Sequence, residues 1–470
     1  MQVLEGDYPL VAILGGAVTV ALLFKTAKAY MRPKRYAAPR LTLKGHILNL
    51  LLWPEALLRR KPAFQKLSFE ALQKDASKKT GNKKGTTKRL KDFGEDWYEK
   101  PYRHSVEMLQ SKQLSPLGKY ITFESIAMRL RARLRFYDEL KKLPSTVMST
   151  PLKQPPLFVL GLPRTGTTFL HRLLSLDTTA RCPKTYELVD PVPVVPDSPV
   201  KDKAKRIKFV QKTIDELNSI VPHINAIHEI GAEEAEECFL AMCMDMPMVL
   251  VTMPMYMEDP QMLSKWNFEH MYENYQKVLK LLTHQQGSHE KRWVLKAPLH
   301  LMFIDELRAV FKGARIVWTH RDPCQSIPSM ASFFQTMVEL HEGADVDLYR
   351  IGKSTLGFWA EALKRAMVAL EKIPTPEMGN SIHHVSYEKL IKDPISVVKE
   401  IYAANGFEYS DEYNEILENH IKADKEKRAK KGFGKGNQKH SYSLEMYGLT
   451  KEDVETSCSK YVSKFCAPKT

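Results

Sequence analysis

The sequence has few cysteines, and none of them stand at the spacings that a disulfide framework or a zinc site requires. Its 470 residues contain six, without a C-x-x-C pair: Cys182, Cys238, Cys243, Cys324, Cys458 and Cys466. Either kind of site would place cysteines in close pairs or clusters. The Asn-x-Ser/Thr triplet that accepts N-glycans is also missing. We therefore expect reduced thiols, no metal site and a catalytic region that faces the cytosol.

Motifs that read nucleic acid are missing too, since no zinc-finger spacing, leucine-zipper heptad or aromatic RNA-binding stretch occurs. The chain nevertheless carries a formal net charge of +15. Its surface therefore attracts anions, such as acidic lipids or a small polyphosphate-like ligand. With 43% apolar and 27% charged residues, the composition is that of a globular protein. We expect a folded protein without a nucleic-acid partner.

The chain has one long uncharged apolar run, from Tyr8 to Phe24. It is just short of the ~20 residues that cross a bilayer. Basic residues follow it: Lys25, Lys28, Arg32, Lys34 and Arg35. This asymmetry predicts an uncleaved single-pass anchor with the catalytic domain in the cytosol. A Golgi lumenal domain, a buried core segment and a removed peptide are the alternatives.

The composition divides the chain into three parts. In residues 1–66, the stretch from Gly45 to Lys61 is apolar but too short to cross a bilayer, so we expect either a helix on the membrane surface or one packed on the main domain. In residues 67–150, the basic stretch 75–94 is typical of a solvated linker. A helical lead-in follows, with apolar side chains at spacings of three and four: Ile126, Leu130, Leu134 and Tyr137. Residues 151–470 form the main domain.

A glycine-rich motif, GLPRTGTT at residues 161–168, lies between an apolar strand pattern and an apolar helical pattern. It differs from the loop of nucleotide-hydrolysing proteins, G-x-x-x-x-G-K-[ST], because Thr167 stands where the lysine belongs. Backbone N–H groups at a helix start form an anion site, to which Thr167 and Thr168 add hydroxyls. Arg164 supplies a cation from within the loop.

Two later segments place polar groups at the ends of predicted strands. The strand at Ile316 to Trp318 runs into THRDP, which contains Arg321, and Ser329 follows eight residues later. The stretch SIHHVSYEKL is a second strand, and Tyr387 closes it. Ligands of open α/β sheets bind at the carboxyl ends of parallel strands. We therefore expect these groups to meet the glycine-rich loop.

Together, GLPRTGTT, THRDP with Ser329, and VSYEKLIKDP resemble the sulfotransferases that use 3′-phosphoadenosine-5′-phosphosulfate (PAPS). DFGEDWYEKPY, WVLKAPLHL and KHSYSLEMYGL strengthen the likeness, which covers residues 92–449 in matching order. The resemblance implies PAPS as co-substrate. It also implies an α/β, P-loop NTPase-like fold of three layers, with a central parallel sheet and the loop after its first strand. Residues 151–470 would be the sulfotransferase domain.

The resemblance also assigns residues to the donor site. Five neighbours in the loop would hold the 5′-phosphosulfate: Arg164, Thr165, Gly166, Thr167 and Thr168. Arg321 and Ser329 would bind the 3′-phosphate, and Tyr387 would lie beside the adenine. Relatives also use a late Gly- and Lys-rich loop, for which Lys439 and His440 are the candidates here. Cytosolic relatives carry Lys where Arg164 stands, so this position presents a planar, forked guanidinium instead of a compact ammonium.

Sulfuryl transfer by in-line attack needs charge stabilisation at the leaving phosphate and a base at the acceptor. Arg164, the loop N–H groups and Lys296 are candidates for the first task. For the base, His300 is our first choice, because it follows Lys296 by four residues. The alternatives are His228 and Glu229, which precede an acidic cluster: Glu233, Glu236 and Glu237. The same cluster is also typical of a solvated helix face.

The acceptor is not determined by the sequence. The Met-rich stretch from Cys238 to Met257 is typical of a core, and we also consider it as the lining of a pocket for a lipid- or sterol-like alcohol. An ATP-dependent phosphotransferase and an inactive membrane-tethered protein that binds 3′-phosphoadenosine-5′-phosphate (PAP) are the alternative functions. A homo-oligomer remains open.

Overall fold

A computed structural model gives the structure of the protein. It describes residues 41–52, 68–79, 96–111, 114–222, 224, 230–247, 253–260, 263, 266–343, 346–373, 382–430 and 442–466. The predicted anchor from Tyr8 to Phe24 lies outside these ranges, as does most of the predicted linker. Among the helices within them, none combines the length and the apolar character needed to cross a membrane.

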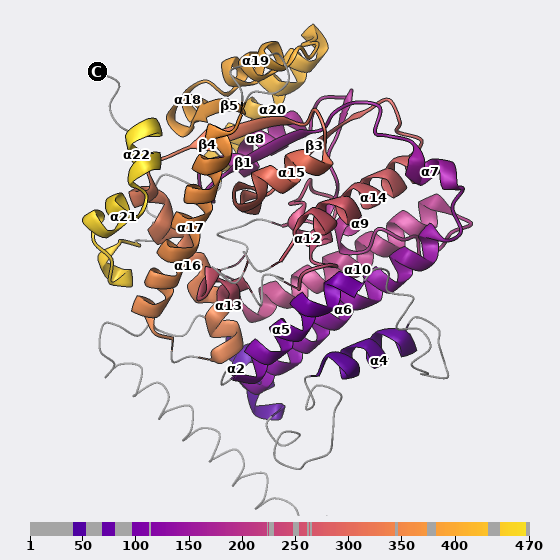
Figure 1. Cartoon of the computed structure of the whole chain (residues 1–470), viewed down its shortest axis with the longest axis vertical. Helices are drawn as coiled ribbons and strands as arrows, with labels where there is room; N and C mark the ends of the chain where they lie inside the picture. The colour runs from indigo at the N-terminus through magenta and orange to yellow at the C-terminus, as the bar shows by residue number, and fades with distance from the viewer. Residues whose placement is uncertain are drawn as a thin grey trace, which may run out of the picture.

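A five-stranded parallel sheet forms the centre of the molecule (Figure 1). Its strand order is β2-β3-β1-β4-β5. The strands are β1 (Leu157–Gly161), β2 (Ala180–Arg181), β3 (Arg292–Lys296), β4 (Arg315–His320) and β5 (Ile382–Ser386). The α/β fold with a central parallel sheet that the sequence predicted is confirmed.

The central strands are apolar along their whole length because both faces of the sheet are covered. In β1, Phe158 and Leu160 pack into the larger core, whereas Leu157 and Val159 pack into a second core on the opposite face. This alternation follows from the two-residue period of a strand. All five β1 residues are buried, so the strand positions the loop after it rigidly.

Helices cover both faces. The larger core is covered by α12 (Phe239–Met242), α13 (Met253–Met257), α14 (Glu269–Gln286), η5 (Pro298–Phe303), α15 (Ile304–Val310), α16 (Pro323–Glu342) and α17 (Leu348–Glu371). The second core is covered by α8 (Thr167–Leu174), α18 (Tyr387–Lys392), α19 (Pro394–Asn405) and α20 (Asp411–Lys430). Five further elements complete this part: α9 (Thr185–Val189), the long helix α10 (Pro199–Ile220), η6 (Glu445–Tyr447), α21 (Lys451–Ser457) and α22 (Ser459–Phe465).

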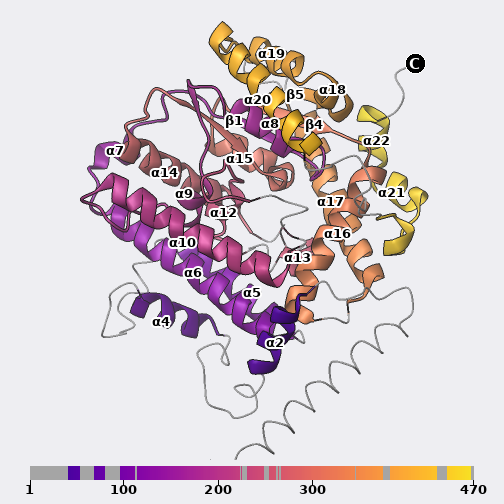
Figure 2. The same ribbon diagram turned by 180° about the vertical axis from the view of Figure 1, so that it is seen from behind.

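The helical lead-in comprises α2 (Leu43–Leu51), α4 (Phe69–Lys79), η3 (Asp96–Tyr98), α5 (Glu99–Ser111), α6 (Pro116–Leu140) and α7 (Ser145–Ser149). Helices α5, α6 and α10 run side by side below the sheet in both views (Figures 1 and 2). Ile126, Leu130 and Leu134 of α6 are fully buried. A buried ion pair from Arg133 of α6 to Asp245 joins the lead-in to the main domain.

The predicted linker begins later than its composition indicates. Residues 75–79 belong to α4, where Ala76 and Ser77 are buried. Asp75 accepts a hydrogen bond from Arg131 of α6 at 2.8 Å. These tertiary contacts stabilise a helix in a stretch whose composition favours a solvated chain.

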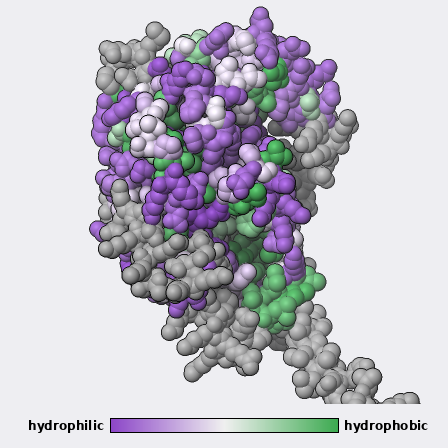
Figure 3. Space-filling model, turned by 90° about the vertical axis from the view of Figure 1, so that its right-hand side faces the viewer, coloured by the Kyte–Doolittle hydropathy of each residue, from purple (hydrophilic) through white to green (hydrophobic). Residues whose placement is uncertain are grey.

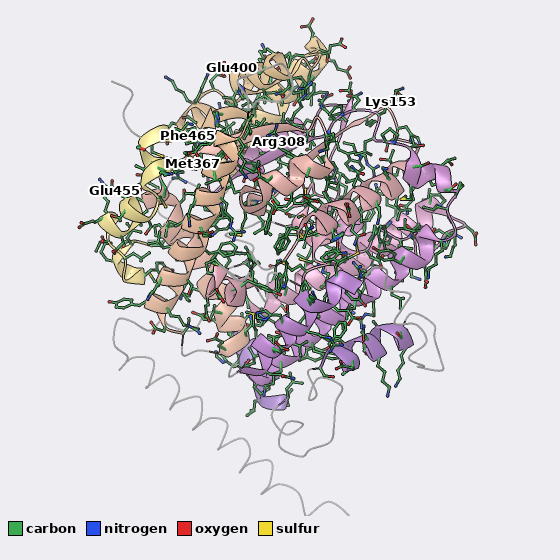
Figure 4. The ribbon with its side chains drawn as sticks, in the orientation of Figure 1. Lys153, Arg308, Met367, Glu400, Glu455 and Phe465 are labelled. Atoms are coloured by element: carbon green, nitrogen blue, oxygen red, sulfur yellow. The ribbon has the colours of Figure 1, made fainter. Side chains whose placement is uncertain are left out.

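The last helix, α22, packs beside the β4–β5 edge of the sheet. The ring of Phe465 stacks on His320 of β4 at 3.9 Å between centroids, with an interplanar angle of 13°. Figure 4 labels Phe465 of α22 and Met367 of α17, two helices that contact each other. Tyr461 adds a hydroxyl 3.2 Å from His320 Nδ1. Helix α22 therefore supports β4, the strand that directly precedes Arg321.

Candidate active site

The loop after β1 is fastened to the neighbouring strand β4. Gly161 has a φ of +152°, and a Cβ at this position would lie 2.3 Å from Thr319 Oγ1, so only glycine fits. Thr165 Oγ1 donates a hydrogen bond to the Leu162 carbonyl at 2.6 Å and lies 2.7 Å from Thr319 Oγ1. These contacts fix the loop before any ligand binds.

Helix α8 begins directly after the loop and directs its first amides outward. Its N-cap, Gly166, has a left-handed φ of +84° and makes no side-chain cap hydrogen bond. A Cβ there would lie 2.9 Å from Leu390 Cδ2 and 3.2 Å from Tyr387 Cδ2. The N–H groups of a first helical turn have no partner within the helix, and they carry the positive end of its dipole. This end of α8 is therefore built to receive an anion.

A guanidinium and an aromatic ring stand next to the loop, at the ends of β4 and β5. Arg321 follows β4, and its Nη1 donates to the Arg164 carbonyl at 2.8 Å. Its Cζ lies 4.2 Å from the centre of the Tyr387 ring. Ser329, two turns into α16, is buried. The structure thus brings Arg164, Arg321 and Tyr387 together, as the sequence predicted.

A buried lysine joins the loop to a carboxylate. Lys296 ends β3, and its side chain is 1% exposed. Its Nζ donates to Glu237 Oε1 at 2.7 Å and to Thr168 Oγ1 at 3.3 Å. The ammonium therefore lies between the start of α8 and Glu237. This arrangement places a cation next to the position that an anion bound to the loop would occupy.

An apolar pocket opens beside this carboxylate. Arg164, Glu236 and Glu237 supply its charged groups. The remaining lining is almost entirely apolar and comes from several separate elements: Pro163, Ile230, Phe239, Leu240, Met253, Pro298, Leu299, Met330, Phe333, Phe334 and Trp359. The pocket therefore suits a hydrophobic molecule that presents one polar end to Glu237.

The structure buries His300, our first choice for the catalytic base, in the core. Its ring is fully buried in η5, where Nδ1 lies 2.8 Å from the Tyr272 hydroxyl and Phe158 packs edge-on at 5.1 Å. Burial, with a smaller contribution from Lys296, lowers the pKa of His300 to about 3. The imidazole is not among the side chains that line the pocket.

Four of the predicted site residues, His228, Glu229, Lys439 and His440, lie outside the described residues. The Met-rich stretch divides between two roles, since its buried methionines join the larger core whereas Met253 also lines the pocket.

Sequence reasoning did not identify Phe333, Phe334 and Trp359 as pocket residues. Their spacing within α16 and α17 is that of ordinary core side chains, so no sequence signal distinguishes them.

Comparison with known proteins agrees with this geometry. A model of the sulfotransferase family matches residues 155–411, more than half of the chain. Over 262 residues the chain is 22% identical to the omega-hydroxy-beta-dihydromenaquinone-9 sulfotransferase Stf3 of Mycobacterium bovis, and equally to its counterpart in Mycobacterium tuberculosis. The alignment covers 54% of this chain, and the chain spans 64% of the length of these curated relatives.

Two crystal structures share the architecture. Sulfotransferase STF1 from Mycobacterium tuberculosis H37Rv superposes with a TM-score of 0.67 at 27% identity, covering 84% of this chain and 98% of that one. Sulfotransferase STF9 from Mycobacterium avium gives 0.68 at 20% identity over 85% and 96% of the two chains, a likeness of fold alone. With the family match over residues 155–411, these findings show that the chain belongs to the sulfotransferase family.

Proposed function

We propose that the chain transfers a sulfuryl group from PAPS to a hydroxyl or amine of a hydrophobic acceptor. One observation carries the proposal: a glycine-rich loop with Thr167 in place of the Walker lysine lies beside an apolar pocket that ends in a Lys296–Glu237 pair. A Walker lysine serves the β- and γ-phosphates of a nucleoside triphosphate. PAPS has no such phosphates, so the loop chemistry suits it better than ATP.

The donor would lie along the carboxyl edge of the sheet. The outward amides of α8, with the Thr167 and Thr168 hydroxyls, suit the 5′-phosphosulfate. The guanidinium of Arg321 suits the 3′-phosphate, with Ser329 as a second donor. The Tyr387 ring, which already packs against Arg321, offers a face to the adenine. Thr165 and Gly166 shape the loop backbone for these contacts.

The chemical step needs only groups at the junction of loop and pocket. PAPS supplies the sulfuryl group, and PAP leaves. Lys296 and Arg164 would stabilise the charge that develops on the departing 5′-phosphate. Glu237 lines the pocket, bonds to Lys296 and is the carboxylate we propose as the base that takes the acceptor's proton. In this proposal Glu237 replaces His300, which packs within the core.

The acceptor class follows from the pocket lining. Aromatic and aliphatic side chains from α12, α13, α16 and α17 surround the space that leads to Glu237. A lipid- or sterol-like alcohol would bury its body there and present its hydroxyl to the carboxylate. The mycobacterial relatives are named for a hydroxylated dihydromenaquinone, and this name supports the same class of hydrophobic alcohol.

The placement of the protein in the cell is part of the proposal. We propose a single-pass anchor at residues 8–24, with the catalytic domain in the cytosol and the Golgi lumen as the alternative. The support is the sequence alone: an apolar run followed by basic residues. We also propose Lys439 and His440 as ligands of the 3′-phosphate, and the support is again the sequence alone.

Transfer of labelled sulfate tests the activity. The full chain is incubated with sulfur-labelled PAPS and cholesterol, dodecanol or glucose, and the labelled products are separated. We expect turnover with the two hydrophobic alcohols and none with glucose. Equal turnover of all three would contradict the acceptor class. Phosphoryl transfer from ATP with magnesium would favour a phosphotransferase, and PAP binding without turnover on any alcohol or amine would favour an inactive tethered protein.

A further inference from the structure

Helix α2 exposes an apolar face. Four side chains, at spacings of four, three and one, lie on one side of the helix: Leu43 is 62% exposed, Ile47 43%, Leu50 42% and Leu51 64%. Figure 3 shows a hydrophobic patch at the height in the molecule where α2 lies in Figure 1. Exposed aliphatic side chains gathered on one short helix mark an interaction surface.

The opposite side of α2 is fixed to the main fold. Gly45 is buried, and a Cβ there would lie 3.1 Å from Ile220 Cγ2. The Thr42 N–H donates to the Ile220 carbonyl at 3.0 Å. Asn49 Oδ1 accepts from the Leu117 N–H at 2.9 Å. These contacts attach α2 to the main fold and set its orientation. The fold itself therefore exposes the apolar face of the helix.

Exposed basic and aromatic side chains lie on α2 and on the start of α6, which α2 contacts, and α2 itself contains no acidic residue. Lys44 is exposed and its Nζ donates to Ser219 Oγ at 2.7 Å. Lys119 and Tyr120 are exposed in the first turns of α6, which Asn49 contacts through Leu117. Aliphatic side chains beside lysines and a tyrosine are the composition of a helix that lies in the interface of a bilayer with anionic lipid.

The chain that leads into α2 matches the same environment. The apolar run from Tyr8 to Phe24 ends 18 positions before Thr42, and the residues between them include basic side chains. An extended chain of that length reaches at most about 60 Å. A bilayer is thus the occupant to which both the apolar face and the preceding sequence are suited. We propose that the α2 face formed by Leu43, Ile47, Leu50 and Leu51 docks on a lipid bilayer.

Docking would bring the pocket close to the membrane. Phe333 of α16 lines the pocket and also packs against the cluster of Leu41, Ile220 and Met337 that seats α2. The wall of the pocket and the docking face therefore share one helix layer. A hydrophobic alcohol dissolved in the bilayer would then be available next to the pocket. This last consequence rests on the proposed function, whereas docking itself does not.

Photocrosslinking tests the docking face in the full chain. The probe is Ile47→p-benzoylphenylalanine, and the matched control is Ile391→p-benzoylphenylalanine. Ile391 is 52% exposed on α18, at the opposite end of the molecule from α2 (Figures 1 and 2). Each protein is irradiated with vesicles of equal parts phosphatidylcholine and phosphatidylserine, and the adducts are identified by mass. Both positions are exposed, so neither substitution disturbs the core.

We expect phospholipid adducts at position 47 to exceed those at position 391 by at least about tenfold. Equal lipid adducts at the two positions, or none at either, would overturn the proposal. A crosslink from position 47 to a peptide of residues 1–40 would identify this chain's own N-terminal segment as the occupant. A crosslink that doubles the mass would identify a second copy. Sulfuryl transfer measured on a soluble alcohol is unaffected by any of these outcomes, so failure here is separable from failure of the proposed activity.

Discussion

The carboxyl edge of the sheet and the apolar pocket beside it are built in opposite ways. The edge takes its polar groups from three short stretches, each of which directly follows a strand: the loop after β1, Arg321 after β4 and Tyr387 after β5. The pocket takes its wall from the larger core, where α12, α13, η5, α16 and α17 each contribute one to three side chains. The edge is thus encoded locally, whereas the pocket is a product of how helices pack.

This difference implies a division of labour. The edge would bind the donor, which is the same molecule for every acceptor. The polar groups of the edge are accordingly held in place by backbone and strand geometry. The pocket would bind the acceptor, and its wall can vary through single core substitutions without changing the loop. Lys296 and Glu237 lie where the two regions meet. Substitutions should therefore separate into donor, junction and acceptor effects.

The largest effect is expected at the proposed base. Glu237→Gln removes the carboxylate that accepts a proton and should lower kcat by about 10²–10⁴-fold. His300→Gln should change kcat by less than about threefold, because the ring is buried against Tyr272 and its neutral form is already enforced. Steady-state kinetics with saturating PAPS and acceptor measures both. A larger loss of kcat in His300→Gln than in Glu237→Gln would show that His300 is the base.

Lys296→Met should follow in size, since it removes the cation that contacts both Thr168 and Glu237. We expect kcat to fall by about 10²–10³-fold, the range seen when one charge-stabilising donor is removed. Lys399→Met, on the exposed side of α19, is the matched control and should leave kcat unchanged. If Lys296→Met lowers only thermal stability, the lysine is a structural partner of Glu237 and nothing more.

Trp359→Ala separates the two regions most clearly. The indole comes from α17 and lines the pocket, so kcat/KM for a hydrophobic alcohol should fall by about 10–100-fold. The dissociation constant of PAP should stay within about twofold, because no donor contact is changed. Val368→Ala, also on α17 but 42% exposed, is the control for the helix. A parallel loss of PAP affinity would mean that the pocket and the edge are one site.

The smallest expected effect concerns the pH dependence of stability. Buried histidines on two different helices should lower the stability at acidic pH in the same way. His171 on α8 and His341 at the end of α16 are buried, and desolvation lowers their pKa values to about 3 and about 4. Each native state therefore favours the neutral ring, so stability is complete above the unfolded pKa of about 6.5 and is lost as pH falls below it.

At pH 5 the unfolded chain binds a proton on each of these rings and the native state does not, which lowers the free energy of unfolding by about 2 kcal/mol per ring. Denaturant unfolding at pH 7 and pH 5 measures the loss. His171→Gln and His341→Gln should each reduce the difference between the two pH values by a similar amount. A native state that is equally stable at both pH values would contradict the burial of these rings.

The sequence allowed the edge to be predicted more fully than the pocket. GLPRTGTT, Arg321 and Tyr387 each stand next to an apolar strand pattern, and parallel strands bring their carboxyl ends to one edge. The sheet and its loop were therefore accessible from local patterns. Phe333 and Trp359 were not, because an apolar side chain in a helix has the same spacing whether it faces a core or a cavity.

Two features of the structure could not be read from the local sequence for physical reasons. His300 stood four residues after Lys296, a spacing that suggested a shared site. However, the chain between them leaves β3 and enters the short helix η5, which turns the imidazole into the core against Phe158. Residues 75–79 had the composition of a linker, yet contacts with α6 hold them in α4. In both cases tertiary contacts, which a linear pattern does not contain, decided the outcome.

Calorimetric titration of the full chain with PAP and, separately, with ATP tests the central claim most directly, namely that the edge built by the loop, Arg321 and Tyr387 is a PAPS site. The account predicts micromolar PAP binding, much weaker ATP binding, loss of the PAP signal in Arg321→Ala and its retention in Trp359→Ala. Absence of PAP binding, or PAP binding that Arg321→Ala leaves unchanged, would contradict it.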